Sequence, residues 1–262
     1  MLSQEVYKTY CQTYKSIWDY LRSVSVDRSV VIQNICSLRS YDIDRMYDTL
    51  DSVGFVFVDD SKFKKETLAS IPDIPELSQN TFGLLSTTGE FLLSGRFIFP
   101  VRDMLGNIVA LIGWFPDEKK YITTPSALFS KEGMFFGMEQ LSSVGIGKDF
   151  VLVEGIFDSI SVRSLGLNCV AEMGIVSSRY KETLYKLFRR VVAIPDNDTE
   201  GRKVISEDKW RLPIGGRYFR WTGAKGIKDI DDLIKSFDVE DVKGLISDIF
   251  NETDRVVSVS LV

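Results

Sequence analysis

The sequence VLVEGIFD, residues 151–158, decides the fold. With Phe150 before it, VLV forms an apolar run typical of a strand buried on both faces of a sheet. Glu154 follows this strand directly, and a helical pattern runs from about Asp158 to Leu165. Further strands are predicted at 169–171, 191–194 and 217–221, with helices at 180–188 and near residue 201. Because strands alternate with helices, we expect a parallel α/β sheet.

Acidic residues follow three of these strands, directly after the first two and several residues after the third. They are Glu154, then Asp196 and Asp198 in IPDND, then Asp229, Asp231 and Asp232 in KDIDD. The carboxyl ends of parallel strands meet at one edge of a sheet, so we expect these carboxylates to lie together. Crowded carboxylates need a compensating cation, and their hard oxygen atoms suit Mg²⁺ or Mn²⁺. The sequence therefore predicts a divalent-metal site for phosphate chemistry.

Each acid taken alone has a simpler interpretation. Asp196, Asp198 or Asp229 alone is typical of a helix N-cap. Asp158 lies one helical turn after Glu154, and Asp232 falls in a first helical turn, so either is open to interpretation as a solvated acid. Acids after three strands at equivalent positions favour the shared site over separate caps.

The composition excludes several classes of chemistry. The 262 residues include no histidine, which excludes Ser-His-Asp and Cys-His catalysis. Cys11, Cys36 and Cys169 are too few and too far apart for a closed zinc site or a disulfide framework. The longest apolar run, 108–115, is too short to span a bilayer, so we expect a cytoplasmic protein with no membrane partner. The net charge is −5, but the acids of the predicted site account for it, which leaves nucleic acid as a possible partner.

Five segments resemble those of a known family. VLVEGIFD, AIPDNDTEGRK (193–203) and KDIDD (228–232) resemble the Toprim domain of DnaG-type primases, topoisomerases and some nucleases. GRFIFPVRDMLGNIVALIGW (95–114) and KYITTPSALFSKEGMFFGM (120–138) are similar to primase segments that the other Toprim proteins lack. The chain thus resembles the RNA polymerase catalytic core of a DnaG-type primase, bacterial or from a phage, over about residues 95–235.

The resemblance implies an α/β fold, with a Toprim parallel-sheet core preceded by a mixed α+β primase N-terminal subdomain. It divides the chain into an N-terminal helical and α+β subdomain (1–94), a β-rich primase segment (95–148), a Toprim metal-binding domain (149–238) and a C-terminal helix and tail (239–262). Periodicity predicts helices over 4–24, 27–38 and 42–53 in the first of these. Strands over 96–101 and 108–115 flank a predicted hairpin turn at 103–106.

The resemblance also implies roles for individual residues. Those implied as metal ligands are Glu154, Asp196, Asp198, Asp229 and Asp231. Those implied as catalytic are Glu154, Asp196, Asp198 and Lys131. Those implied to contact nucleotide or nucleic acid are Arg96, Lys120, Lys131, Arg202 and Lys228. Arg96 and Lys120 stay open to interpretation as surface cations, whereas Phe97, Phe99, Phe135 and Phe136 are expected in the core.

The implied activity is that of a DNA-directed RNA polymerase, a nucleotidyltransferase that makes short RNA primers on single-stranded DNA from ribonucleoside triphosphates. The implied cofactor is Mg²⁺ or Mn²⁺, with no zinc. A replicative helicase is an expected partner. A separate zinc-bearing or template-recognition protein is another, since the family's zinc module has no counterpart in this sequence. A family arginine is also replaced, by Trp114. The alternatives are a Toprim nuclease and a catalytically silent, primase-like replication scaffold.

Overall fold

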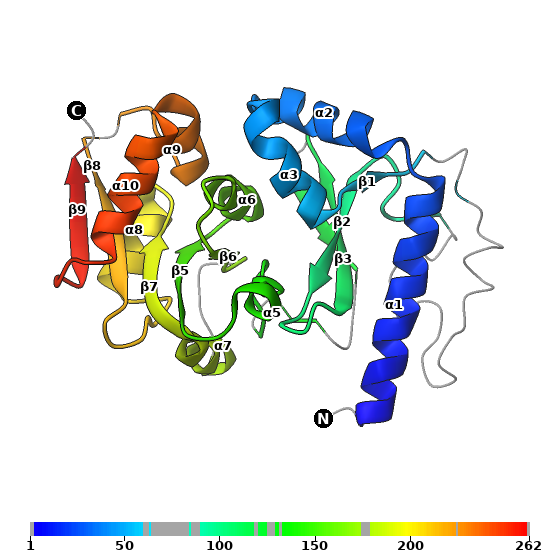
Figure 1. Cartoon of the computed structure of the whole chain (residues 1–262), viewed down its shortest axis with the longest axis horizontal. Coiled ribbons are helices and arrows are strands. Elements are labelled where there is room, and N and C mark those ends of the chain that lie inside the picture. Colours follow the sequence, from blue (N-terminus) through cyan, green and yellow to red (C-terminus); the bar gives the residue numbers. More distant parts are fainter. Residues whose placement is uncertain are drawn as a thin grey trace. The chain divides into compact units, whose positions relative to one another are not determined.

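The computed structural model describes residues 3–59, 63, 84, 90–117, 120–124, 129–130, 133–173, 179–223 and 225–260. The chain forms two compact units, Met1–Ser130 and Lys131–Val262 (Figure 1). The four-part division expected from the sequence stays a prediction. No helix in the described ranges is long and apolar enough to cross a membrane.

Three helices open the first unit, as the sequence predicts. They are α1 (Gln4–Val24), α2 (Arg28–Arg39) and α3 (Ile43–Val53). Each begins at a residue whose side-chain oxygen accepts a hydrogen bond from the first turn: Ser3, Asp27 and Asp42. The apolar face of α1 includes Tyr14, Ile17 and Leu21, which are buried in the core of this unit.

An antiparallel sheet completes the first unit. Its strands are β1 (Val56–Phe57), β2 (Phe97–Arg102), β3 (Ile108–Phe115) and β4 (Lys120–Thr123), paired in that order. The predicted hairpin turn between β2 and β3 is confirmed. Asp103 Oδ1 accepts hydrogen bonds from the backbone N–H groups of Leu105 and Asn107, and Gly106 takes a positive φ of 82°. Phe97 and Phe99 are buried, as expected.

The second unit contains a five-stranded parallel sheet in the order β6-β5-β7-β8-β9 (Figure 1). The strands are β5 (Lys148–Val153), β6 (Cys169–Ala171), β7 (Phe188–Ile194), β8 (Arg217–Thr222) and β9 (Val256–Ser260). The predicted parallel α/β sheet is therefore confirmed. The C-terminal tail forms β9 beside β8.

Helices connect these strands. The short helix α5 (Gln140–Val144) precedes β5, and α6 (Ile156–Ser164) joins β5 to β6. The helix α7 (Arg179–Leu184) and a 3₁₀ turn (Tyr185–Leu187) lead to β7, and α8 (Thr199–Ser206) joins β7 to β8. Two helices, α9 (Ile230–Ser236) and α10 (Val239–Ile249), join β8 to β9. The helix predicted over 180–188 ends earlier, because Phe188 already pairs in the sheet. Phe135 and Phe136 are buried, as predicted.

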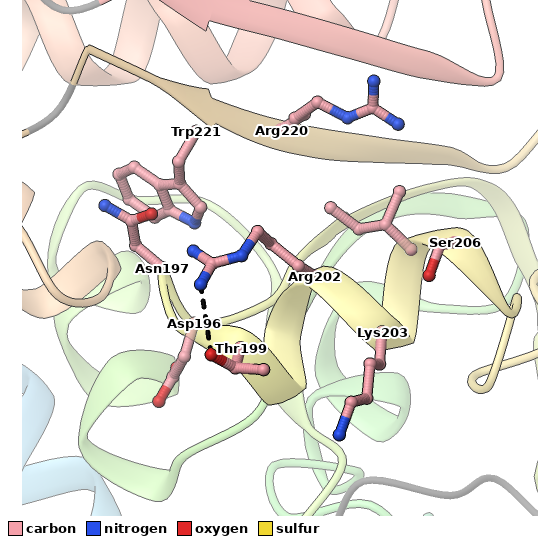
Figure 2. Close-up of a pocket in the computed structure, with 9 residues that line it drawn as sticks. Asp196, Asn197, Thr199, Arg202, Lys203, Ser206, Arg220 and Trp221 are labelled. Carbon is pink, nitrogen blue, oxygen red and sulfur yellow. Dashed lines mark hydrogen bonds between the residues drawn. The ribbon is translucent and has the colours of Figure 1, made fainter.

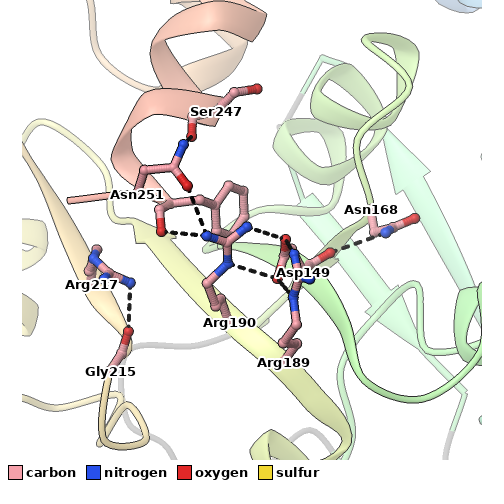
Figure 3. Close-up of polar contacts among 9 residues, drawn as sticks. Asp149, Asn168, Arg189, Arg190, Gly215, Arg217, Ser247 and Asn251 are labelled. Carbon is pink, nitrogen blue, oxygen red and sulfur yellow. Dashed lines mark hydrogen bonds and ion pairs between the residues drawn. The ribbon is translucent and has the colours of Figure 1, made fainter. Parts of the chain in front are cut away.

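Arginine side chains anchor the sheet at the amino ends of β5 and β7 (Figure 3). Asp149 on β5 forms ion pairs with both Arg189 and Arg190, and the Arg190 contact is 2.7 Å. The two guanidinium groups hold the pKa of Asp149 well below its ordinary value. Arg190 also donates to the Phe250 carbonyl oxygen and to Asn251 Oδ1, each at 3.0 Å. This network ties two central strands to the end of α10.

Candidate active site

Glu154 stands where β5 ends and α6 begins. Its carbonyl oxygen accepts a hydrogen bond from the Met173 N–H at 3.1 Å, which fixes the backbone against the end of β6. The next residue, Gly155, donates its N–H to Asp158 Oδ2 at 3.1 Å. A Cβ atom on Gly155 would lie 2.3 Å from that oxygen, so a side chain here would displace the Asp158 carboxylate. Asp158 therefore shapes the backbone after Glu154.

Asp196 and Asp198 lie in the loop between β7 and α8. Asp198 Oδ1 caps α8 by accepting a hydrogen bond from the Gly201 N–H at 2.8 Å. A Cβ atom on Gly201 would lie 1.9 Å from the Asp196 carbonyl oxygen, so only glycine fits there without a backbone shift. The carboxylate of Asp196 takes no part in capping α8. The two acids thus differ: one carboxylate is committed to a helix, and the other is not.

Asp229 and Asp231 lie at the start of α9, but their side chains form hydrogen bonds with different partners. Asp229 caps the helix, with Oδ1 accepting from the Asp232 N–H at 2.8 Å. Asp231 is 1% exposed. Its oxygens accept hydrogen bonds from Ser161 Oγ at 2.5 Å and from Lys235 Nζ at 2.6 Å. Asp231 therefore ties α9 to α6.

Four carboxylates influence one another electrostatically around Lys228. Burial raises the pKa of Glu154, and the nearby Asp198 raises it further. Burial raises the pKa of Asp196 to about 7, with Glu154 and Asp229 adding to the effect. Burial also raises the pKa of Asp229. Lys228 opposes all three shifts. We call Glu154, Asp196, Asp198 and Asp229 the acid cluster.

The acid cluster suits a divalent cation by its chemistry. Among the described residues, neither the Glu154 nor the Asp196 carboxylate accepts a hydrogen bond, so both keep their oxygen atoms available as hard ligands. Burial and mutual repulsion disfavour their charged forms, and a bound cation would relieve both effects. In the described part of the chain, however, no three His, Cys, Asp or Glu side chains lie close enough together to hold a metal ion. The carboxylates of Asp198 and Asp229 are instead bonded to the backbone N–H groups of Gly201 and Asp232.

The predicted cationic residues are spread over the chain. Lys228 adjoins the acid cluster, and Arg202 on α8 donates to Thr199 Oγ1 at 3.2 Å. Arg96 and Lys120 belong to the first unit, where the Arg96 guanidinium carbon lies 5.2 Å from the centre of the Phe115 ring. Lys131 lies outside the described residues.

Two residues that contribute to this edge of the sheet were missed in the sequence. Asn197 donates its backbone N–H to the Lys228 carbonyl oxygen at 2.7 Å and its side-chain amide to the Ile227 carbonyl oxygen at 2.8 Å. Glu172 directly follows β6, so the rule that located the other acids also locates it. It is 0% exposed and forms an ion pair at 3.2 Å with Lys181, which is 1% exposed.

Comparisons with known proteins agree with this geometry. Residues 151–234, which contain the whole acid cluster, match a family model described as Toprim-like. The DNA primase of Deinococcus radiodurans is 34% identical over 152 residues, which cover 55% of this chain and 26% of that protein. The DNA primase of Clostridium acetobutylicum is 32% identical over 112 residues, which cover 41% of this chain and 19% of that protein. The chain thus spans about a quarter or less of the length of these relatives.

Solved structures extend the likeness to both units. A DnaG primase catalytic domain bound to single-stranded DNA superposes with a TM-score of 0.75 at 18% identity, covering 94% of this chain and 80% of that one. The chain has the fold of a DnaG primase catalytic core. The zinc-binding and RNA polymerase domains of Aquifex aeolicus primase give a TM-score of 0.69 at 24% identity, covering 94% of this chain and 62% of that one. The predicted fold class, a Toprim parallel-sheet core preceded by a mixed α+β subdomain, is confirmed.

The structure also describes Trp114, the position where the resemblance implies a family arginine. Trp114 is 4% exposed and packs against Phe97 with ring centroids 5.5 Å apart. In this chain the position therefore contributes to the core of the first unit.

Proposed function

We propose that this chain is the catalytic core of a DNA primase, a DNA-directed RNA polymerase that makes short RNA primers from ribonucleoside triphosphates. The observation that carries the proposal is the acid cluster, which three strand ends of a Toprim-like domain deliver to one edge of the sheet. The sequence likeness to DNA primases supports the same activity. The second unit alone would suit other Toprim proteins, whereas the fold of both units favours a primase.

In this proposal Glu154 and Asp196 hold divalent cations, Mg²⁺ or Mn²⁺, with Asp198 and Asp229 beside them. When bound, such cations neutralise phosphate charge and position the attacking and leaving oxygens for nucleotidyl transfer. The chain itself fixes the backbone of Glu154 through Met173 and that of Asp196 through the close approach of Gly201. Lys228 supplies a positive charge among the carboxylates. We assign Asp231 a supporting role, since its oxygens are bonded to Ser161 and Lys235.

We propose single-stranded DNA as the template, because a DnaG catalytic domain of the same fold binds it. Arg96, Lys120, Lys131 and Arg202 are proposed to contact the nucleic acid or the incoming nucleotide. A replicative helicase and a zinc-bearing or template-recognition protein are proposed partners. The proposed place of action is the bacterial cytoplasm, in a host cell if a phage encodes the chain.

The test is RNA synthesis on single-stranded DNA of varied sequence with labelled ribonucleotides and Mg²⁺ or Mn²⁺. A second reaction supplies a pre-annealed RNA primer, because elongation does not depend on start-site recognition. We expect elongation by the wild type and a loss of about a hundredfold or more in Asp196→Asn, since one of the proposed ligands is gone. Asp248→Asn is the matched control, because this exposed acid lies on α10. Equal elongation by wild type and Asp196→Asn would contradict the proposal.

Parallel reactions without ribonucleotides separate the two alternatives. A Toprim nuclease would cleave labelled single-stranded DNA with Mn²⁺ in the absence of ribonucleotides. A silent scaffold would neither cleave nor elongate, and its affinity for DNA would change little with added metal.

A further inference from the structure

A pocket opens between α8 and β8, beside the acid cluster (Figure 2). Its volume is about 410 Å³, and its lining includes Asp196, Asn197, Thr199, Arg202, Arg220 and Trp221. We call it the α8–β8 pocket. The volume falls in the range of ~300–1,000 Å³ typical of small-molecule sites. Since Asp196 belongs both to this pocket and to the acid cluster, a ligand here would lie next to the proposed reaction site.

Two arginines give the pocket its charge. Arg202 comes from α8 and Arg220 from β8, and in the described part of the chain neither forms an ion pair with a carboxylate. The third cation of the lining, Lys203, is engaged by Glu200 at 2.5 Å. Figure 2 shows Arg202 reaching from α8 toward Trp221 and Asn197, whereas Asp196 points away from them. A guanidinium group on each wall is well suited to bind a phosphate, since its N–H groups match the phosphate oxygens.

Trp221 supplies an aromatic wall that is held in place. Its indole N–H donates to the Pro195 carbonyl oxygen at 2.7 Å, which fixes the ring. The Phe219 ring packs edge-on at 4.6 Å between centroids and supports it from within. A partly exposed, immobilised aromatic ring is a platform on which a nucleobase of any sequence can stack.

We propose that the α8–β8 pocket binds a nucleotide, with its phosphate between Arg202 and Arg220 and its base against Trp221. Two arginines and an indole around one cavity match a ligand that combines an anion with a planar ring. Nucleotide binding in this pocket does not depend on the proposed function, which only suggests where the nucleotide comes from. That source is either a free ribonucleoside triphosphate or a nucleotide within a single strand.

The chain carries its own reporter of binding. Of its four tryptophans, Trp18, Trp114 and Trp210 are 4%, 4% and 0% exposed, whereas Trp221 is half-buried. Base stacking on Trp221 should therefore quench tryptophan fluorescence without a contribution from the other three. ATP and a short oligothymidylate, titrated separately into the full chain in EDTA, distinguish the two sources without turnover.

We expect quenching by at least one of these probes, and affinity about tenfold lower in Arg220→Gln, for the loss of one charge-assisted phosphate contact. Lys148→Gln, at the far end of β5, is the matched control and should bind as the wild type does. Trp221→Phe should still bind ATP in calorimetry but lose the quenching. The proposal is overturned if neither probe quenches at millimolar concentration, if Arg220→Gln binds normally, or if inorganic tripolyphosphate binds as tightly as ATP.

The outcome is separable from that of the proposed function. Binding that depends on Arg220 in a protein unable to elongate RNA would support the pocket and contradict the primase activity. Elongation that depends on Asp196, with unchanged nucleotide affinity and unchanged KM in Arg220→Gln, would support the primase activity and contradict the proposed pocket.

Discussion

Asn197 and Lys228 lie in different loops and are joined by a backbone hydrogen bond of 2.7 Å from the Asn197 N–H to the Lys228 carbonyl oxygen. The Asn197 side chain adds a second bond to the Ile227 carbonyl oxygen. Asp196 and Asp198 flank this asparagine, and Asp229 follows the lysine. The two bonds therefore hold the acid-bearing loops of β7 and β8 at a fixed distance.

Replacing Asn197 by Asp should impair elongation about tenfold or more, because the side chain loses its donor and adds a like charge to the acid cluster. The Mg²⁺ concentration needed for half-maximal elongation should also change in Asn197→Asp, because the substitution alters the charge of the acid cluster. Asn168→Asp is the control, since it removes a similar 3.1 Å bond, to the Asp149 carbonyl oxygen, at the opposite edge of the sheet. Equal effects of the two substitutions would argue against a specific role for Asn197.

The stability of the metal-free protein should depend on pH through Asp196. Its pKa in the folded chain is about 7, above its ordinary value of 3.8. The folded state therefore binds this proton more tightly than the unfolded state. The stability it contributes is fully present below about pH 4 and is lost as pH rises toward and through 7. Melting temperatures in EDTA should accordingly fall over this range.

Asp196→Asn provides the test of that assignment. In EDTA at pH 8 this variant should melt at a higher temperature than the wild type, and its melting temperature should fall less between pH 4 and 8. Added Mg²⁺ should stabilise the wild type most at high pH, where no proton competes for the carboxylate. A variant with the same pH profile as the wild type would place the titration elsewhere.

Replacing Asp231 should lower the stability of the fold, because its side chain links α6 to α9. Asp231→Ala leaves Ser161 and Lys235 without their shared partner and should lower the free energy of unfolding by about 3 kcal/mol. Denaturant unfolding measures this loss. Asp241→Ala, an exposed acid on α10, should change it by less than about 0.5 kcal/mol. A fully stable Asp231→Ala protein that no longer binds metal would instead make Asp231 a ligand.

Two glycines offer a matched pair. Gly201→Ala places a Cβ atom 1.9 Å from the Asp196 carbonyl oxygen, so the loop must move, and both stability and elongation should fall. Gly244 lies inside α10 with no heavy atom within 4 Å of an added Cβ. Gly244→Ala should therefore raise the free energy of unfolding by about 0.5–1 kcal/mol and leave elongation unchanged. Similar behaviour of both variants would show that the close approach at Gly201 is not needed.

The sequence predicts the sheet and the place of the acids well, because both follow from local rules. Apolar runs mark the strands, and residues directly after parallel strands share one edge. The same rules cannot say where a side chain at that edge is directed. Asp231 falls two residues after Asp229, yet a serine seventy positions earlier, Ser161, binds it in the interior. Such a contact depends on how α6 and α9 pack.

Other features of the site depend on tertiary packing that the sequence does not reveal. Glu172 follows a strand as the other acids do, but its burial and its ion pair with Lys181 depend on the packing of α7. Trp221 belongs to an evident strand, yet only the fold shows that it lines a pocket with residues of α8. Lys131 falls outside the described residues, so its implied role stays a prediction.

The network around Asp149 and the acid cluster give the parallel sheet two unlike edges. At the amino edge one carboxylate is neutralised by two guanidinium groups, whereas at the carboxyl edge Lys228 opposes the raised pKa values of Glu154, Asp196 and Asp229. Engineering can exploit this separation. Substitutions that strengthen the amino edge are expected to raise the melting temperature of the protein without affecting the proposed activity. Neutralising an acid at the carboxyl edge is expected to raise stability at the expense of that proposed activity.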